Sequence, residues 1–516
     1  VIKRRRMQAS RLRYKSVSIA LEVFLFETHS KSAHLSRKMV EMNSALETTR
    51  RVLFVLSALV ALLGGCASPP LSDIATARPK NIIIMFADGV APVQWEFGRY
   101  TSRALRNTSF ASTDIVFRDG VLGLLSTDSN DSMVTDSAAG GSAMSIGVKV
   151  NNGSLSVAPD GSAPRTVMQA AKAAGKHIGL VTTAEIYDAT PGTFSVNVKN
   201  RRDNQAIVDQ YFEMEPDVLI GGGRDFFLPK GTPGGKRADG RDVVAAFAQK
   251  GYQIARTPAE MKAANGGRLL ALFADGDMSF ELDRDPAQEP STADMARAAL
   301  DVLSRDNPHG FVLLVENENT DTAGHDNDIA ALTRALWAFD DAVKVALEFQ
   351  RQAPGETLIL LAGDHETGGL SVTYALRDVT GPGAKLRFYP TVKELEMVQR
   401  ITASLSVVER ALGAAPTGED LDRLVAKHFP GFKLDADLRE AILKRTPLER
   451  NLNGYGPVRA ALSRMVSRQT GFYWGTTGHT TEPVAVGALG PGAQLFRGYQ
   501  DNTAFARHLH SLIGGK

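Results

Sequence analysis

The amino-acid sequence predicts an α/β protein, a three-layer α/β/α sandwich whose mostly parallel central sheet is accompanied by a helical insertion. From residue 80 onward, short apolar runs alternate with amphipathic stretches of helical length. Strands that alternate with helices are typical of a parallel sheet covered on both faces. The apolar runs are also continuous, as expected of strands that are buried on both sides.

Seven runs are expected to form the sheet, and five stretches to form helices that flank it. The strands are 81–87, 177–183, 217–223, 268–274, 310–316, 357–363 and 482–490. The helices are 164–176, 242–251, 291–305, 327–351 and 501–513. Ser291 followed by Asp294 is a helix N-terminal signal, because both side chains can accept bonds from the first backbone N–H groups.

Between residues 378 and 468 the alternation stops. The segments 390–412, 418–429 and 435–445 are amphipathic and are not separated by apolar runs. We interpret 378–468 as a helical insertion that covers the rim of the site or forms a dimer contact. It divides the core into a first part, 80–377, and a C-terminal part, 469–516.

Composition bounds the function only loosely. The chain has 516 residues, of which 43% are hydrophobic and 22% charged, with a net charge of +2. This is the composition of a globular protein with a large core. The charge is too balanced to indicate a nucleic-acid partner.

The N-terminal region resembles an export signal. Two arginines precede an apolar run that is shorter than the roughly 20 residues needed to span a bilayer, and small residues follow before Cys66, the only cysteine. The sequence Leu63-Gly64-Gly65-Cys66 is similar to a bacterial lipobox, in which cleavage precedes the cysteine and its thiol is lipidated. The alternative is a core helix with a buried cysteine.

This interpretation divides the first 79 residues into three segments. Residues 42–66 form a lipoprotein signal peptide with its lipobox, 67–79 form a tether, and 1–41 form an extension upstream of a start at Met39 or Met42. We therefore expect an exported protein, anchored to a bacterial membrane through lipidated Cys66 on the periplasmic or cell-surface side. Ala67 is not an inner-membrane retention aspartate, which favours the outer membrane.

Metal-ligand residue types gather at predicted strand ends. They are Asp88 after 81–87, Glu316 with Asp321 and His325 after 310–316, and Asp364 and His365 after 357–363. Functional groups in open α/β sheets collect at the carboxyl ends of strands. Each residue alone is more often a turn residue, but buried carboxylates in this number need cations as counter-charge. Carboxylate with imidazole suits zinc, whereas oxygen ligands suit magnesium.

Ser137 lies in the segment 133–153, which has almost no bulky side chains near the serine. On spacing alone, Asp136 or Ser137 caps a helix. The alternative is a nucleophile placed at a helix N-terminus, where backbone dipoles favour anions. The two interpretations are compatible.

Six motifs together resemble the alkaline phosphatase family of the two-zinc, one-magnesium type, in the family's order and over residues 80 to about 512. They are FADGV, VTDSAAGGSAMSIGVK, VTTAEIYDATPGTFSVNVKNRR, VENENTDTAGH, AGDHETGG and TTGHT. The resemblance implies hydrolysis of small phosphate monoesters to an alcohol and inorganic phosphate through a phosphoserine on Ser137.

The resemblance also implies a role for each site residue. One Zn²⁺ is held by Asp321, His325 and His479, the second by Asp88, Asp364 and His365 near Ser137, and Mg²⁺ by Asp88, Thr190 and Glu316. Arg201 clamps two phosphate oxygens. Asp136, Asp188 and Thr322 lie behind these groups. Asp188 favours Mg²⁺ in the third site, and Thr322 stands where relatives often carry a cation or histidine.

Rival functions remain open at this point. A phosphodiesterase, sulfatase or phosphomutase shares the ligands at the strand ends, and a non-catalytic phosphate-binding lipoprotein is the alternative outside enzymes. The third metal site and Arg201 favour the dianionic monoester. A homodimer is compatible with the sequence but is not indicated by it.

Overall fold

The computed structural model describes residues 78–378, 385–448 and 456–514. The predicted signal peptide and the lipidation residue Cys66 lie outside these ranges, as do the extension 1–41 and nearly all of the tether. No helix in the described ranges is long and apolar enough to cross a membrane.

The predicted α/β fold is confirmed by a ten-stranded sheet in the order β16-β2-β15-β8-β1-β7-β3-β4-β6-β5. Its strands are β1 (Asn81–Ala87), β2 (Val121–Leu125), β3 (His177–Glu185), β4 (Val218–Gly222), β5 (Gln253–Ala255), β6 (Leu269–Leu272), β7 (Phe311–Asn317), β8 (Thr357–Ala362), β15 (Val484–Leu489) and β16 (Gly498–Gln500). Only β15 runs antiparallel to its neighbours, β8 and β2. The seven predicted strands all belong to this sheet. The short strands β2, β5 and β16 were not predicted.

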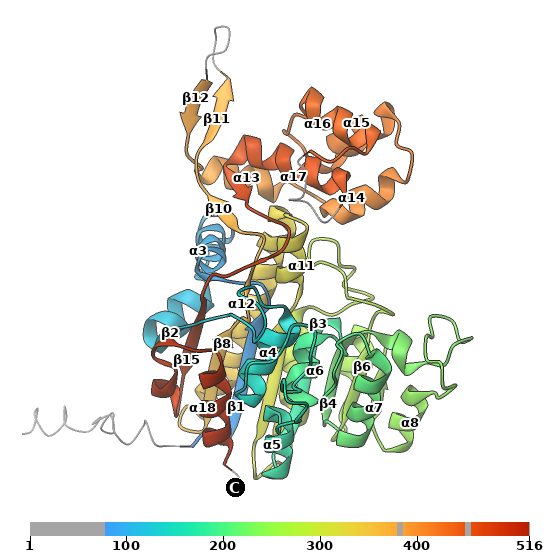
Figure 1. Cartoon of the computed structure of the whole chain (residues 1–516), viewed down its shortest axis with the longest axis vertical. Helices are drawn as coiled ribbons and strands as arrows, with labels where there is room; N and C mark the ends of the chain where they lie inside the picture. The colour runs from blue at the N-terminus through green and yellow to red at the C-terminus, as the bar shows by residue number, and fades with distance from the viewer. Residues whose placement is uncertain (1–77, 379–384, 449–455, 515–516) are drawn as a thin grey trace, which may run out of the picture. The chain divides into compact units, whose positions relative to one another are not determined.

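Helices cover both faces of the sheet (Figure 1). The flanking helices include α3 (Pro92–Thr101), α4 (Ser137–Ile146), α5 (Val167–Ala173), α6 (Ala189–Ser195), α7 (Asn204–Met214), α8 (Val243–Gln249), α10 (Thr292–Ser304), α11 (Asn319–His325), α12 (Ile329–Gln352) and α18 (Thr503–Ile513). Ser291 caps α10 as predicted, since its side chain accepts from Asp294 N.

Strand β1 shows how the layers form. Its residues are fully buried and alternate between two hydrophobic cores. Ile83 and Met85 pack on the side of α10 and α12, and Ile84 and Phe86 pack on the opposite side. Because successive side chains of a strand point to opposite faces, a continuous apolar run can serve both cores at once.

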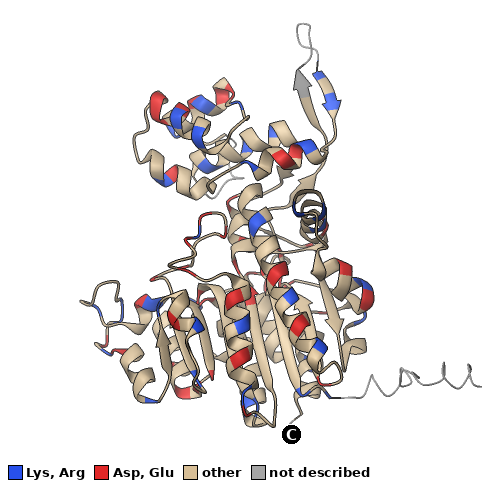
Figure 2. Cartoon of the chain, turned by 180° about the vertical axis from the view of Figure 1, so that it is seen from behind, with Lys and Arg blue, Asp and Glu red and all other residues tan. Residues whose placement is uncertain are grey.

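The insertion begins with a hairpin that the sequence pattern did not predict, formed by β11 (Ala375–Asp378) and β12 (Lys385–Phe388). Five helices follow it: α13 (Val392–Gln399), α14 (Leu405–Leu412), α15 (Gly418–His428), α16 (Ala436–Lys444) and α17 (Pro457–Thr470). The amphipathic segment 390–412 is divided into α13 and α14, the segments 418–429 and 435–445 correspond to α15 and α16, and α17 was not predicted. Each of α13 to α16 buries a leucine-rich face in the core shared with α10 and α12. Positive and negative side chains are interspersed along the helices seen in Figure 2, which agrees with the small net charge of +2.

Candidate metal centre and nucleophile

Three neighbouring strands end at the candidate site. β1 lies between β7 and β8, and Phe86 is in register with Glu316 on one side and Ala362 on the other. Asp88 therefore follows β1 beside Glu316, and Asp364 follows β8 at the same edge. The structure thus brings together the strand ends that the sequence singled out.

One group of potential metal ligands consists of Asp88, Asp364 and His365, all buried. His365 Nε2 lies 3.3 Å from Asp364 Oδ2 and 3.6 Å from Asp88 Oδ1. Burial and the charges of Asp321 and Glu316 raise the pKa of Asp88, and burial beside Asp88 raises that of Asp364. Burial also lowers the pKa of His365, which keeps the imidazole neutral, as metal ligation requires.

A second group of ligand atoms joins Asp321, His365 and His479 within 4.8 Å. His325 faces the same point, because its Nε2 lies 3.1 Å from Asp321 Oδ2 and 3.1 Å from His479 Nε2. Burial disfavours the charged form of His325, but the Asp321 carboxylate outweighs burial and raises the pKa of His325 to about 9. For Asp321, burial is likewise outweighed by His325, and its pKa falls below the usual range.

Backbone carbonyls orient the two partly exposed imidazoles, those of His325 and His479. His325 Nδ1 lies 2.6 Å from Thr477 O, and His479 Nδ1 lies 2.8 Å from Thr135 O. A carbonyl oxygen only accepts, so each Nδ1 carries a hydrogen. Each Nε2 therefore faces the Asp321 carboxylate, and in the neutral imidazole it is the nitrogen that can bind a metal.

The third predicted site lies around Glu316. The Thr190 hydroxyl donates to Asp88 Oδ2 at 3.2 Å, and the Thr182 hydroxyl donates to Glu316 Oε2 at 2.5 Å. Burial raises the pKa of Glu316 to about 8. Asp88, Thr190 and Glu316 thus offer oxygen atoms, the ligand type that Mg²⁺ prefers.

Ser137 is the first residue of α4, and its Oγ lies 3.1 Å from His365 Nε2. Asp136 caps the helix by accepting from Ala139 N at 2.8 Å. The small residues of α4 are required by close neighbours, because a Cβ on Gly140 would lie 3.0 Å from Asp364 Cβ and one on Gly141 2.6 Å from Thr193 Oγ1. The helix cap and the candidate nucleophile are therefore adjacent residues, Asp136 and Ser137.

Arg201 reaches the same helix start from the loop after α6. Its Nη1 lies 3.4 Å from Asp136 Oδ2 and its Nη2 3.1 Å from Asp188 Oδ1. Its side chain is 27% exposed. The two carboxylates hold the guanidinium near Ser137, where its planar fork suits phosphate oxygens.

Thr322, which the family resemblance places behind the ligands, donates to Glu318 Oε1 and Oε2 at 2.9 and 2.8 Å. Two further residues beside the ligands, Thr367 and Glu366, escaped the sequence analysis. The Thr367 hydroxyl bonds Asp321 Oδ1 and lies 3.2 Å from His365 Nδ1. Buried Glu366 accepts from Thr480 Oγ1 at 2.7 Å, next to His479. The only signal available for Thr367 and Glu366 was their position directly after Asp364-His365.

The residues present fit bound cations. Within the described part of the chain, Asp88 Oδ1 and Asp364 Oδ2 have no hydrogen-bond partner. Two buried carboxylate oxygens without donors are costly unless a cation or a proton neutralises them. Phosphate is the substrate group that matches a serine at a helix N-terminus beside such cations and a guanidinium. The fold and the site together define a metal-dependent hydrolase of phosphate esters.

Sequence comparison gives the family. The alkaline phosphatase family profile matches residues 79–514, and the chain belongs to that family. It is accordingly a metal-dependent phosphomonoesterase.

Individual relatives agree over most of their lengths. The chain is 31% identical to alkaline phosphatase 3 of Bacillus subtilis, covering 84% of this chain and 89% of that protein. It is 31% identical to the repressible alkaline phosphatase of Saccharomyces cerevisiae, covering 80% and 76%. The structure of Thermus thermophilus alkaline phosphatase matches with a TM-score of 0.75 and 31% identity, covering 85% and 92% of the two chains.

Proposed function

We propose that this phosphatase acts through a phosphoserine on Ser137, with two zinc ions and one magnesium ion. The observation that carries the proposal is the position of Ser137 Oγ, 3.1 Å from His365 Nε2 and at the N-terminus of α4. Ser137 is buried, 5% exposed, and its hydroxyl lies beside a group of potential metal ligands.

The ligand sets divide by chemistry. Asp321, His325 and His479 would hold one Zn²⁺, and Asp88, Asp364 and His365 the other, because both sets mix carboxylate with imidazole. Asp88, Thr190 and Glu316 offer only oxygen atoms and would hold Mg²⁺. When bound, the ions neutralise the phosphate dianion, lower the pKa of the serine hydroxyl and stabilise the leaving oxygen.

The protein groups then carry the two half-reactions. Ser137 Oγ attacks phosphorus and gives up its proton to water as the new P–O bond forms; the ester P–O bond breaks, and the leaving oxygen takes up a proton and departs as the alcohol. A water molecule next attacks the phosphoserine, the P–Oγ bond breaks, a proton returns to Oγ, and inorganic phosphate leaves. In both steps Arg201, fixed by Asp136 and Asp188, binds two phosphoryl oxygens. The N–H groups at the start of α4 add partial positive charge.

One comparison tests this chemistry. The metal-replete protein is assayed on an aryl phosphate monoester and on the matching diester, and inorganic phosphate is expected to inhibit competitively. Ser137→Ala removes the nucleophile, so turnover should fall at least a thousandfold while zinc content is unchanged. A preference for the diester, or full activity of Ser137→Ala, would contradict the proposal.

We also propose that the protein is exported and held at a bacterial membrane by lipidated Cys66. The support is the lipobox-like LGGC at 63–66 alone. Labelling cells with a fatty-acid analogue should mark the wild type but not Cys66→Ala, which should leave the membrane fraction. The homodimer stays a prediction, to be tested by light scattering.

A further inference from the structure

The turn directly after His325 is held by the helical insertion. Residues 326–328 connect α11 to α12, and three bonds reach them from the insertion. Arg459 of α17 pairs with the Asp326 carboxylate. The Ser463 hydroxyl of the same helix donates to the carbonyl of residue 327 at 2.7 Å, and Leu405 N of α14 donates to the carboxylate of residue 328 at 2.7 Å.

Arg459 is the central contact of this turn. Its Nε lies 2.7 Å from Glu409 Oε2 on α14, while Nη1 reaches Asp326. The Asp326 side chain is only 2% exposed. Removing one partner of an ion pair whose other member is buried is strongly destabilising, because the remaining charge stays uncompensated. The position of Asp326 therefore depends strongly on Arg459.

The turn at residues 326–328 also fixes the C-terminal end of α11, which is a very short helix. α11 has seven residues and carries both Asp321 and His325. Asp326 N donates to Thr322 O at 2.9 Å, so the turn closes the last helical bond. A helix of two turns has little stiffness of its own. Displacing Asp326 consequently displaces the imidazole next to it.

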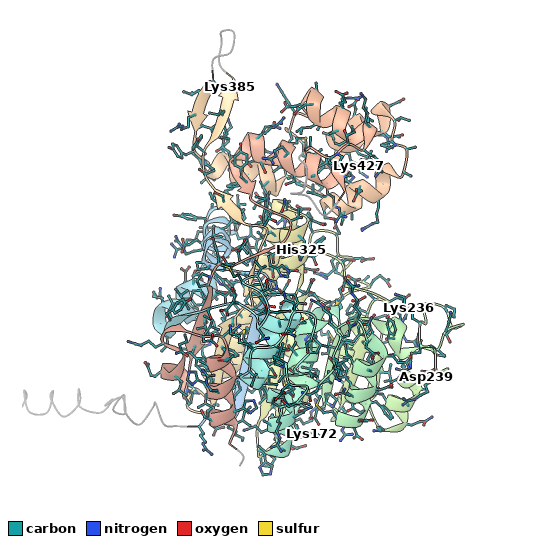
Figure 3. The ribbon with its side chains drawn as sticks, in the orientation of Figure 1. Lys172, Lys236, Asp239, His325, Lys385 and Lys427 are labelled. Atoms are coloured by element: carbon teal, nitrogen blue, oxygen red, sulfur yellow. The ribbon has the colours of Figure 1, made fainter. Side chains whose placement is uncertain are left out.

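The other side of the imidazole is tethered to a separate segment. His325 Nδ1 bonds Thr477 O at 2.6 Å, two residues before His479. Figure 3 shows His325 between the sheet and the segment that carries Lys427, which belongs to the insertion. His325 is thus held between the loop that carries His479 and the turn that is bound by Arg459.

We propose that Arg459 is a positioning residue: by gripping Asp326 it aligns His325, so that the helical insertion sets how tightly the Asp321–His325–His479 site retains its zinc. The inference rests on the proposed zinc assignment. Substituting groups that orient metal ligands typically lowers metal affinity 10- to 100-fold. The insertion thereby contributes to zinc retention through a residue that is not itself a ligand.

The test measures zinc retention in the full-length chain without substrate. Zinc-loaded wild type and Arg459→Met are mixed with a chelator, and released zinc is followed over time. Arg459→Met should lose one zinc about tenfold faster and the second at the wild-type rate. The matched control is Arg468→Met on the same helix, which removes ion pairs of 2.8 and 2.7 Å to Asp435 and Asp437 but does not touch the turn. Equal release by both variants would overturn the proposal.

A cobalt-loaded sample and a double-mutant cycle separate positioning from general loss of structure. Arg459→Met should change the visible spectrum of Co²⁺ bound in this site, whereas Arg468→Met should not. Asp326→Asn combined with Arg459→Met should be no worse than either alone, because both break one path. Additive losses would overturn the route through Asp326. If Arg459→Met fails to fold, Arg459→Lys, which keeps one charge contact, should show an intermediate release rate, and a wild-type rate would overturn the proposal.

The same experiment separates this inference from the proposed function. A wild-type protein that binds no zinc contradicts both. A wild type that binds two zinc ions and an Arg459→Met variant that retains them equally well contradict only the role of Arg459.

Discussion

Gly89 illustrates, at the scale of one residue, how little space the site leaves. It follows Asp88 with φ of +71°, and a Cβ there would lie 2.7 Å from Asp321 Oδ1 and 2.8 Å from Thr367 Oγ1. The backbone must therefore pass between Asp321, a proposed metal ligand, and Thr367, which bonds it. Only glycine meets both the conformational and the steric requirement.

Gly89→Ala should lower thermal stability and zinc content together. The matched control is Gly161→Ala, where φ is +85° but no atom lies within 4 Å of the added Cβ. Both changes incur backbone strain of about 1 kcal/mol, and Gly89→Ala adds about 1–3 kcal/mol of overpacking. Calorimetry and metal analysis compare the two. Equal effects would show that the close approach to Asp321 is unimportant.

The edge of the sheet concentrates acidic groups beyond the ligands themselves. β3 ends at Glu185, whose backbone N–H donates to Asp277 Oδ1 at 3.0 Å. Burial, with the charges of Asp277 and Asp188, raises the pKa of Glu185 to about 7. Ionisation of Glu185 at this edge of the sheet therefore lowers the stability of the folded protein.

Glu185→Gln should stabilise the protein at pH 8.5 but not below pH 5. The folded pKa is raised above the unfolded value, so the wild type has the associated stability below about pH 4.5 and loses it as pH rises through 7. After a discount for partial exposure, the difference should be about 1 kcal/mol. Urea unfolding at both pH values measures it, with exposed Glu213→Gln on α7 as control. A pH-independent difference would refute the cause given.

The sequence predicted long elements better than short ones. Strands such as β1 and β8 are buried on both faces and give continuous apolar runs, which are unmistakable. β2 alternates buried and exposed residues within VLGLL, and β5 and β16 have three residues each, so none gives such a run. Local pattern contains no record of the tertiary contacts that make these segments strands.

Site residues were also predictable only where the local sequence marks them. Asp88 and Asp364 could be singled out because each directly follows a continuous apolar run, 81–87 or 357–363, that predicts a buried strand. Arg201 depended on the family resemblance, since nothing local marks it. The pair of Asp326 with Arg459 spans 133 positions of the chain, and no spacing rule reaches that far. A contact between residues so far apart in the chain can be found only in the folded structure.

At the scale of the whole molecule, the candidate metal centre brings several buried carboxyl groups close together. Burial raises the pKa of Asp88, Asp364 and Glu318, which means that the folded chain resists their ionisation. These carboxyls come from β1, β8 and the start of α11. Cations bound between them therefore stabilise the arrangement of the strands, and not only the transition state.

Chelation should consequently lower the melting temperature. A site filled at a thousand times its Kd contributes about 4 kcal/mol to stability, so EDTA should lower Tm by several degrees. Differential scanning calorimetry with EDTA, and then with Zn²⁺ and Mg²⁺ restored, measures the effect. An unchanged Tm would mean that the described structure needs no ions to stay folded.

The position of β15 in the sheet has a consequence for the order in which the strands can assemble. This strand comes near the end of the chain, yet it lies between β8 and β2 and pairs with both. β2 and β16 consequently cannot join the sheet until β15 has been synthesised and has arrived. His479 is delivered by the same late segment. A ribosome must therefore finish almost the whole polypeptide before the sheet can close, and until then the nascent chain holds neither a complete sheet nor a working catalyst.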